Sequence, residues 1–186
     1  RSCWIKISKI LLFILYINDI VQEVNPAVFT GIYADDLKLF ASRKESKNLQ
    51  DAIDLVSDWS AKWNMSFAVQ KCTVMQYGIS DLSSNYSLNG TILSRSETVR
   101  DLGIQMSPNL LFDKHVKSII LKAESRVNNI MRCFKCTEMQ FLTKAFSTYV
   151  LPLLENATEV WSPTTSGLQN NLEKVQRTFT RRVFHR

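Results

Sequence analysis

The periodicity of the sequence changes at Pro108, and this change limits the possible folds more than any other feature. Before Pro108, short runs of β-branched and aromatic residues alternate with turn residues, a pattern that predicts strands and hairpins. After Pro108, apolar residues recur every three or four positions over long stretches, which predicts amphipathic helices. The sequence therefore predicts an α+β part over residues 1–106 and an all-helical part over residues 107–186.

Within the first part, residues 49–63 show helical spacing of apolar side chains, and the apolar run 10–20 predicts a buried helix. Asn89-Gly90 is a strong hairpin signal, because both residues tolerate the left-handed backbone of a type I′ turn. The predicted elements are a helix over 10–20, strands over 27–33 and 37–41, a helix over 49–63, a strand over 69–77, a hairpin around Asn89-Gly90, a strand over 99–106, and helices over 112–134, 140–151 and 168–183.

Composition narrows the class of protein. The chain has 186 residues, 45% of them hydrophobic and 22% charged, which excludes disorder throughout and biased fibrous sequences. Four unevenly spaced cysteines do not make a disulfide scaffold, and they favour a reducing setting. The longest apolar run, residues 10–17, is shorter than the roughly 18–20 residues of a membrane span. We therefore expect an intracellular protein, nuclear or cytoplasmic, that is neither secreted nor membrane-bound.

The net charge of +6 is confined to one half of the chain. Residues 1–93 hold nine basic and nine acidic side chains, whereas residues 94–186 hold fourteen basic and eight acidic ones. A basic half joined to a neutral half favours a polyanionic partner such as nucleic acid. The alternative is a solvated helical half with a lysine-rich surface.

Tyr33-Ala34-Asp35-Asp36 is the sharpest chemical feature, because it places two carboxylates between two short apolar strands. At a tight turn, neighbouring carboxylates attract a divalent cation, and oxygen ligands suit Mg²⁺. Two-metal phosphoryl transfer uses carboxylates to hold ions roughly 3.5–4 Å apart. The alternative is an ordinary solvated turn, since Asp is a common turn residue.

YADD on a strand–turn–strand resembles the metal-binding motif of reverse transcriptases, and the surrounding segments resemble the non-LTR (LINE-like) retrotransposon group. LLFILYINDI (residues 11–20) is similar to the helix after the dNTP-pocket motif of that family. WSAKW (59–63) with KCTVM (71–75) is similar to the next palm motif. The resemblance implies a partial polymerase palm, an antiparallel sheet with helices, over residues 1–106.

The later segments continue the resemblance in chain order to residue 184. VRDLGI (99–104) with LFDKH (111–115) resembles the primer grip and the start of the thumb. VLPLLE (150–155), VWSP (160–163) and LEKVQR (172–177) resemble the helical region after the palm. The resemblance therefore implies a thumb-like region over residues 107–186.

The resemblance also implies roles for individual residues. Asp35 would be a ligand of both catalytic Mg²⁺ ions and Asp36 a weaker ligand, with Tyr33 and Ala34 flanking them. Lys71 would lie near the incoming triphosphate and donate a proton to pyrophosphate; the alternative is a surface lysine at a strand start. These three residues, Asp35, Asp36 and Lys71, are the catalytic candidates.

Nucleic-acid contacts are implied for two further groups. Leu102, Gly103 and Ile104 would place the primer end through backbone contacts. The phosphates of template and primer would be bound by Lys114, Lys117, Lys122 and Arg126, although a solvated helix face remains the alternative. The implied partners are an RNA template, a DNA primer and dNTPs, without a membrane or a small-molecule organic cofactor.

Two departures from the family pattern bear on activity. Family polymerases carry another metal-binding Asp upstream of all these motifs, and no segment here supplies it. Residues 1–10 contain no Gly, Gln or Pro where the nucleotide-pocket motif is expected. We therefore expect a fragment of an RNA-directed DNA polymerase that is inactive in isolation. The alternatives are a non-catalytic nucleic-acid-binding module and a decayed transposon remnant.

Overall fold

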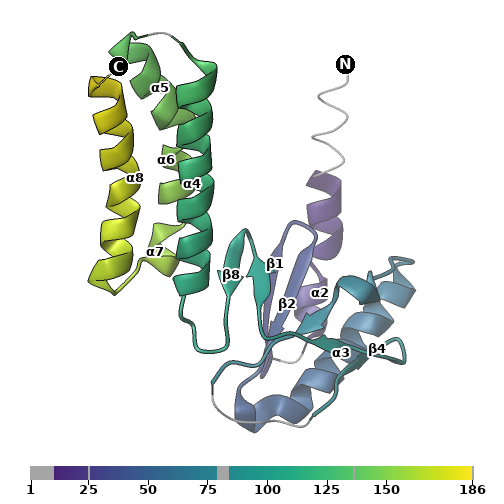
Figure 1. Cartoon of the computed structure of the whole chain (residues 1–186). Coiled ribbons are helices and arrows are strands. Elements are labelled where there is room, and N and C mark those ends of the chain that lie inside the picture. The colour runs from purple at the N-terminus through teal and green to yellow at the C-terminus, as the bar shows by residue number, and fades with distance from the viewer. Residues whose placement is uncertain (1–10, 25, 79–83, 136, 186) are drawn as a thin grey trace, which may run out of the picture. The chain divides into compact units, whose positions relative to one another are not determined.

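The computed structural model describes residues 11–24, 26–78, 84–135 and 137–185 and divides them into two compact units (Figure 1). The N-terminal unit consists of the described residues within 11–74 and 84–95. The C-terminal unit takes 75–78 and everything from Ser96 onward. Its boundary therefore lies ahead of residues 99–106, whereas the sequence pattern had placed these residues, as one strand, with the first part.

The fold is α+β, as the sequence predicted. The N-terminal unit holds α2 (Ile20–Glu23), β1 (Phe29–Tyr33), β2 (Asp36–Phe40), η1 (Arg43–Glu45), α3 (Ser46–Lys62), η2 (Val69–Lys71), β3 (Thr73–Val74), β4 (Ser87–Leu88), β5 (Thr91–Ile92) and β6 (Ser94–Arg95). The C-terminal unit holds β7 (Val99–Asp101), β8 (Ile104–Met106), α4 (Asp113–Cys133), α5 (Met139–Tyr149), α6 (Leu151–Glu155), α7 (Thr158–Trp161) and α8 (Ser166–Phe184).

The strands of the described ranges pair in four separate two-stranded ladders rather than in one continuous sheet. Pairs β1–β2, β4–β5 and β7–β8 are antiparallel hairpins, whereas β3 pairs with β6 in parallel. Asn89 and Gly90 have φ of 52° and 73°, so the β4–β5 turn is the type I′ turn that the sequence predicted.

Packing in the N-terminal unit is organised by α3. Its apolar stripe buries Ala52, Val56 and Trp59 against Ile20 of α2 and Val28. The Trp59 indole also donates to the Asp19 carboxylate at 3.2 Å. Asn64, at φ 54°, follows the last turn in the left-handed conformation that commonly terminates helices.

The N-terminal helical stretch is more exposed than its sequence predicts. Residues 11–17 are helical, but Leu11, Leu12 and Leu15 are 56%, 64% and 73% exposed, and Ile17 alone of this stretch is buried. The expectation of a buried helix is therefore wrong for the described residues 11–17. None of the helices in the described ranges has the length and hydropathy that crossing a bilayer requires.

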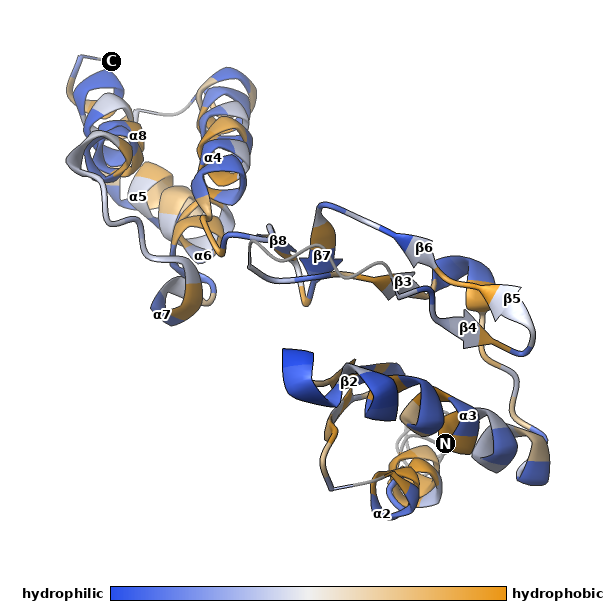
Figure 2. Cartoon of the chain, turned by 90° about the horizontal axis from the view of Figure 1, so that it is seen from below, coloured by the Kyte–Doolittle hydropathy of each residue, from blue (hydrophilic) through white to orange (hydrophobic). Residues whose placement is uncertain are grey.

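The C-terminal unit is a helical bundle with a hairpin at one end. Helices α4, α5 and α8 bury Val127, Leu142 and Phe179 in one cluster, and Phe146 stacks on Phe179 with ring centroids 4.4 Å apart. Apolar and polar residues alternate around α4 and α8 in Figure 2, as expected for amphipathic helices. The hairpin β7–β8 packs onto this bundle through Ile104, which joins Val116 and Trp161 in a second cluster.

Three local expectations require correction. Residues 69–77 form a 3₁₀ turn and the two-residue strand β3 instead of one strand. Residues 99–106 form two strands, because Leu102-Gly103 makes a turn between them. The helix expected over 140–151 ends at Tyr149, and a second helix, α6, begins at Leu151 with Pro152 in its first turn, where a missing N–H breaks no helical hydrogen bond.

Candidate functional site

The two aspartates lie at the tip of the β1–β2 hairpin. The register pairs Tyr33 with Asp36, which leaves Ala34 and Asp35 as a two-residue turn. All four residues are exposed, and the Cα atoms of Asp35 and Asp36 are about 3.8 Å apart because the residues are adjacent. The tip therefore presents two consecutive aspartates that are both open to solvent.

Ala34 has φ 52°, a left-handed conformation that a residue with a Cβ adopts at a cost of about 1–2 kcal/mol. Five register pairs of the ladder hold the hairpin around it. Strained turns of this kind persist where the surrounding structure holds them, and they are concentrated at functional sites. Leu102, Leu110 and Ala157 also have positive φ, so the strain at Ala34 is consistent with a functional site but does not identify one.

The donor set at the tip consists of the carboxylates of Asp35 and Asp36. Two carboxylates suit Mg²⁺ in kind. However, the described residues contain no group of three His, Cys, Asp or Glu side chains that could hold a metal ion. Asp35 and Asp36 therefore do not by themselves form a complete two-ion centre in the described part of this chain.

Lys71 ends the 3₁₀ turn η2 and is exposed. Within the described ranges, it forms no ion pair with Asp35 or Asp36. The following Cys72 is half-buried, its thiol lies 3.5 Å from the Ala68 carbonyl oxygen, and burial raises its pKa. The structure thus assigns Lys71 to the same unit as the aspartates but does not show the two in contact.

The segment Leu102–Ile104 forms the turn and first strand residue of the β7–β8 hairpin. Leu102 and Gly103 have φ of 45° and 91°, the pair of positive values that defines a type I′ turn. Leu102 is 49% exposed, whereas Ile104 is 7% exposed and packs in the C-terminal unit. Of the three, Leu102 and Gly103 project at the tip, and Ile104 anchors the hairpin.

The four basic side chains predicted to bind phosphates all lie on α4. Lys114, Lys117, Lys122 and Arg126 are exposed. Arg126 also donates to the Tyr149 carbonyl oxygen at 2.6 Å, so part of its guanidinium already binds within the unit. The three lysines have no such hydrogen bond or ion pair in the described part of the chain.

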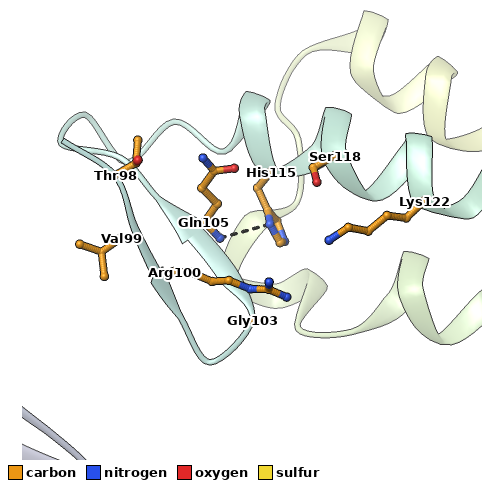
Figure 3. Close-up of a pocket in the computed structure, with 8 residues that line it drawn as sticks. All are labelled: Thr98, Val99, Arg100, Gly103, Gln105, His115, Ser118 and Lys122. Atoms are coloured by element: carbon orange, nitrogen blue, oxygen red, sulfur yellow. Dashed lines mark hydrogen bonds between the residues drawn. The ribbon is translucent and has the colours of Figure 1, made fainter. Parts of the chain in front are cut away.

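Two residues of interest lay outside the sequence prediction. Arg100 and His115 line a cavity between β7–β8 and α4 together with Lys122 (Figure 3). The sequence does indicate that residues 115, 118 and 122 lie on one helix face, because they are separated by three and then four positions. Arg100 could not be placed with them, because its partner strand was not predicted.

The sequence is similar to a known protein family and to several known proteins. Residues 10–143 match the family described as reverse transcriptase (RNA-dependent DNA polymerase). An uncharacterized protein of Caenorhabditis elegans is 33% identical over 88 residues, which are 47% of this chain and 44% of that protein. No solved structure matches significantly.

Two further relatives are named RNA-directed DNA polymerase from mobile element jockey. The Drosophila funebris protein is 23% identical over 175 residues, 89% of this chain and 19% of its own length. The Drosophila melanogaster protein is 28% identical over 105 residues, 53% of this chain and 12% of its own length. The chain therefore spans less than half the length of each of these relatives.

The family match covers most of the chain and includes the YADD hairpin, and the jockey relatives are polymerases of mobile elements. Both findings confirm the resemblance that the sequence motifs indicated. This chain belongs to the reverse transcriptase (RNA-dependent DNA polymerase) family.

Proposed function

We propose that this chain is the part of an RNA-directed DNA polymerase that contains the two-aspartate hairpin, a partial palm and a helical thumb. The observation that carries the proposal is Asp35 and Asp36 side by side at the strained, exposed tip of β1–β2, in a chain whose family copies RNA into DNA. The substrates of the parent reaction are an RNA template, a DNA primer and dNTPs, and divalent ions such as Mg²⁺ are the cofactor.

The residues take the following parts in this proposal. Asp35 and Asp36 are two of the carboxylates of the metal centre, and Lys71 lies near the triphosphate. Leu102 and Gly103 contact the primer end, with Ile104 as their anchor. A basic surface on α4 binds template and primer phosphates through Lys114, Lys117, Lys122 and Arg126.

We further propose that the 186-residue chain does not polymerise on its own. Among its described residues, no third His, Cys, Asp or Glu side chain joins Asp35 and Asp36 to form a metal site. Losing one shared ligand removes the geometry that holds both ions. The test is primer extension on an RNA template with dNTPs and Mg²⁺. No incorporation is expected, and incorporation that Asp35→Ala abolishes would contradict the proposal.

Long-read sequencing of the transcript across the codon for Arg1 separates this proposal from its alternatives. If the reading frame supplies an upstream Asp and a Gly- and Gln-containing pocket motif, the longer protein should extend a primer. Asp35→Ala in that protein should then abolish extension, whereas Lys174→Gln, on the exposed face of α8, should leave it unchanged. Activity that survives Asp35→Ala would exclude the two-aspartate hairpin as the metal site.

A non-catalytic nucleic-acid-binding role is the second candidate, and the excess of basic residues in 94–186 favours it. Its test is binding of the chain to RNA, DNA and hybrid duplexes at several salt concentrations. Each phosphate that a Lys or Arg neutralises contributes about 0.9 to the slope of log K against log salt on duplex DNA. Binding that is undetectable, or that does not weaken with salt, would remove this candidate.

A further inference from the structure

The turn of the β4–β5 hairpin holds a side chain and a backbone nitrogen that can react with each other. Asn89 and Gly90 form this two-residue turn, and they are the only Asn-Gly pair in the sequence. Both residues are exposed, and a Cβ placed on Gly90 would meet no atom within 4 Å. Water and solvent bases therefore reach the turn freely.

A glycine that follows an asparagine allows a reaction within the chain. The Gly90 nitrogen, which no neighbouring Cβ crowds, can attack the side-chain amide carbon of Asn89. A solvent base accepts the Gly90 amide proton as the new nitrogen–carbon bond forms. The amide nitrogen of Asn89 takes a proton from water and leaves as ammonia, which closes a cyclic imide. Water then opens the imide at either carbonyl carbon and gives Asp or isoAsp, so that one water is consumed and one ammonia released.

The base of the hairpin is anchored on α3 (Figure 1). Tyr86 and Leu88 are 8% and 5% exposed and share a buried cluster with Ile53. The Gln50 side-chain amide donates to the Ser87 carbonyl oxygen at 2.9 Å and accepts from the Ser87 N–H at 3.0 Å. These contacts hold β4 in place even when the turn beyond it opens.

The turn itself has weaker support. The β4–β5 ladder has only two register pairs, and an isolated two-stranded hairpin is marginally stable in water. Within the described ranges, the Asn89 side chain has one hydrogen bond, in which the Ser57 hydroxyl of α3 donates to Asn89 Oδ1 at 2.5 Å. Exposed turns with so few bonds open locally while the rest of the unit stays folded.

The bond from Ser57 opposes the reactive geometry. Before attack, the amide carbon of Asn89 must turn toward the Gly90 nitrogen, whereas the hydrogen bond holds the same amide against α3. We propose that Asn89 is a site of spontaneous deamidation, with the Gly90 nitrogen as nucleophile, and that the Ser57 hydroxyl slows the reaction. The proposal does not depend on any catalytic activity of the chain.

The two products have different consequences for the hairpin. Asp at position 89 keeps an oxygen that accepts from Ser57, and the length of the backbone is unchanged. In isoAsp the backbone runs through Cβ and Cγ, which adds one carbon to the turn. Because a type I′ turn fits a two-residue loop, isoAsp should disrupt the β4–β5 ladder, whereas Asp should preserve it.

The chain supplies its own matched control. Asn64 is exposed and has φ 54°, close to the 52° of Asn89, but Met65 follows it in place of a glycine. The full chain is aged in mildly alkaline buffer, and its tryptic peptides 63–71 and 72–95 are mapped by mass spectrometry. Asn89 should convert to the acid and accumulate isoAsp, which an isoaspartyl methyltransferase labels, while Asn64 stays intact. Conversion at Asn89 that is no faster than at Asn64 would overturn the site.

Three variants test the part of Ser57. Ser57→Ala removes one hydrogen bond and should speed conversion about fivefold, the change in an equilibrium that one such bond makes. Ser57→Thr keeps the hydroxyl and should convert at the wild-type rate. Ser125→Ala makes the same truncation at an exposed position of α4, in the other unit, and should leave the rate unchanged. Equal rates in the two alanine variants would overturn the role of Ser57.

A stability measurement separates the two products. Asn89→Asp should keep the urea midpoint of the wild type, because it retains both the turn and the acceptor for Ser57. The isoAsp form, purified from aged protein by ion-exchange chromatography, should unfold at a lower urea concentration. Equal midpoints for the two forms would overturn the predicted loss of the turn.

Discussion

The backbone N–H of Gln105 on β8 donates a hydrogen bond to Nδ1 of His115 on α4, at 3.2 Å. This contact joins the hairpin to the first turns of the helix and requires the ring to be unprotonated at Nδ1. Burial lowers the pKa of His115, and the nearby Lys122 and Arg100 charges lower it further. The folded protein therefore favours the neutral ring.

The first prediction concerns acid stability. Since the folded pKa of His115 lies below its ordinary value of about 6.5, the unfolded chain binds the proton first as the pH falls. Stability is therefore present above pH 6.5 and is lost as the pH drops from 6.5 toward the folded pKa. Urea midpoints between pH 8 and pH 5.5 should fall for the wild type and change less for His115→Gln. Equal pH dependence in the two proteins would contradict the assignment.

The second prediction concerns the β7–β8 turn. Leu102 and Gly103 both have positive φ, and Asn-Gly is the preferred pair for this turn type. Leu102→Asn should raise the free energy of unfolding by about 0.5–1 kcal/mol, because Asn adopts the left-handed region at lower cost. Gly103→Ala should lower it by about 1–2 kcal/mol, although no atom lies within 4 Å of the added Cβ. Urea unfolding measures both changes.

The Leu102→Asn variant also tests the primer-grip proposal. Leu102→Asn keeps the turn, so a loss of duplex affinity in this variant would come from the side chain itself. Unchanged affinity would assign the contact to the backbone of the hairpin. A destabilised Leu102→Asn would contradict the type I′ geometry.

The sequence predicted the elements whose patterns are local and long. Both α3 and α4 lie within a few residues of their expected bounds, since each carries a continuous apolar stripe. The Asn89-Gly90 turn was recognised because its two residues fit one turn type. The β7–β8 turn was not predicted, because leucine rarely adopts a positive φ and Leu102 therefore gives no turn signal.

Among the site residues too, those that are consecutive in the sequence were predicted, and those brought together only by packing were not. The YADD hairpin was predicted from sequence alone, since its chemistry lies in four consecutive residues. The cavity beside His115 was not, because Arg100 and Lys122 are twenty-two positions apart and line one cavity only through the packing of the β7–β8 hairpin on α4. The exposure of Leu12 and Leu15 was also missed, because an apolar run does not show which of its faces is covered.

The third prediction concerns the core of the N-terminal unit. Trp59 is 4% exposed, and its indole donates to Asp19 at 3.2 Å. Trp59→Ala should lower the free energy of unfolding by about 3–5 kcal/mol, the usual cost of removing a large buried aromatic. Asp19→Ala removes only the hydrogen-bond partner and should cost about 1–2 kcal/mol. Chemical unfolding measures both, and equal effects would show that packing contributes little beyond the hydrogen bond.

The last prediction concerns metal binding at the β1–β2 tip. Asp35 and Asp36 are exposed, and no third ligand joins them in the described part of the chain. With a dissociation constant at or above 10 mM, adding ~10 mM Mg²⁺ raises the free energy of unfolding by at most about 0.4 kcal/mol. Urea midpoints in Mg²⁺ and in EDTA should therefore nearly coincide for the isolated chain. Asp35→Asn should leave stability within about 0.5 kcal/mol of the wild type, as an exposed substitution does. A larger Mg²⁺ stabilisation that Asp35→Asn removes would mean that this chain completes the metal site with its own residues, and primer extension by the chain alone would then be expected.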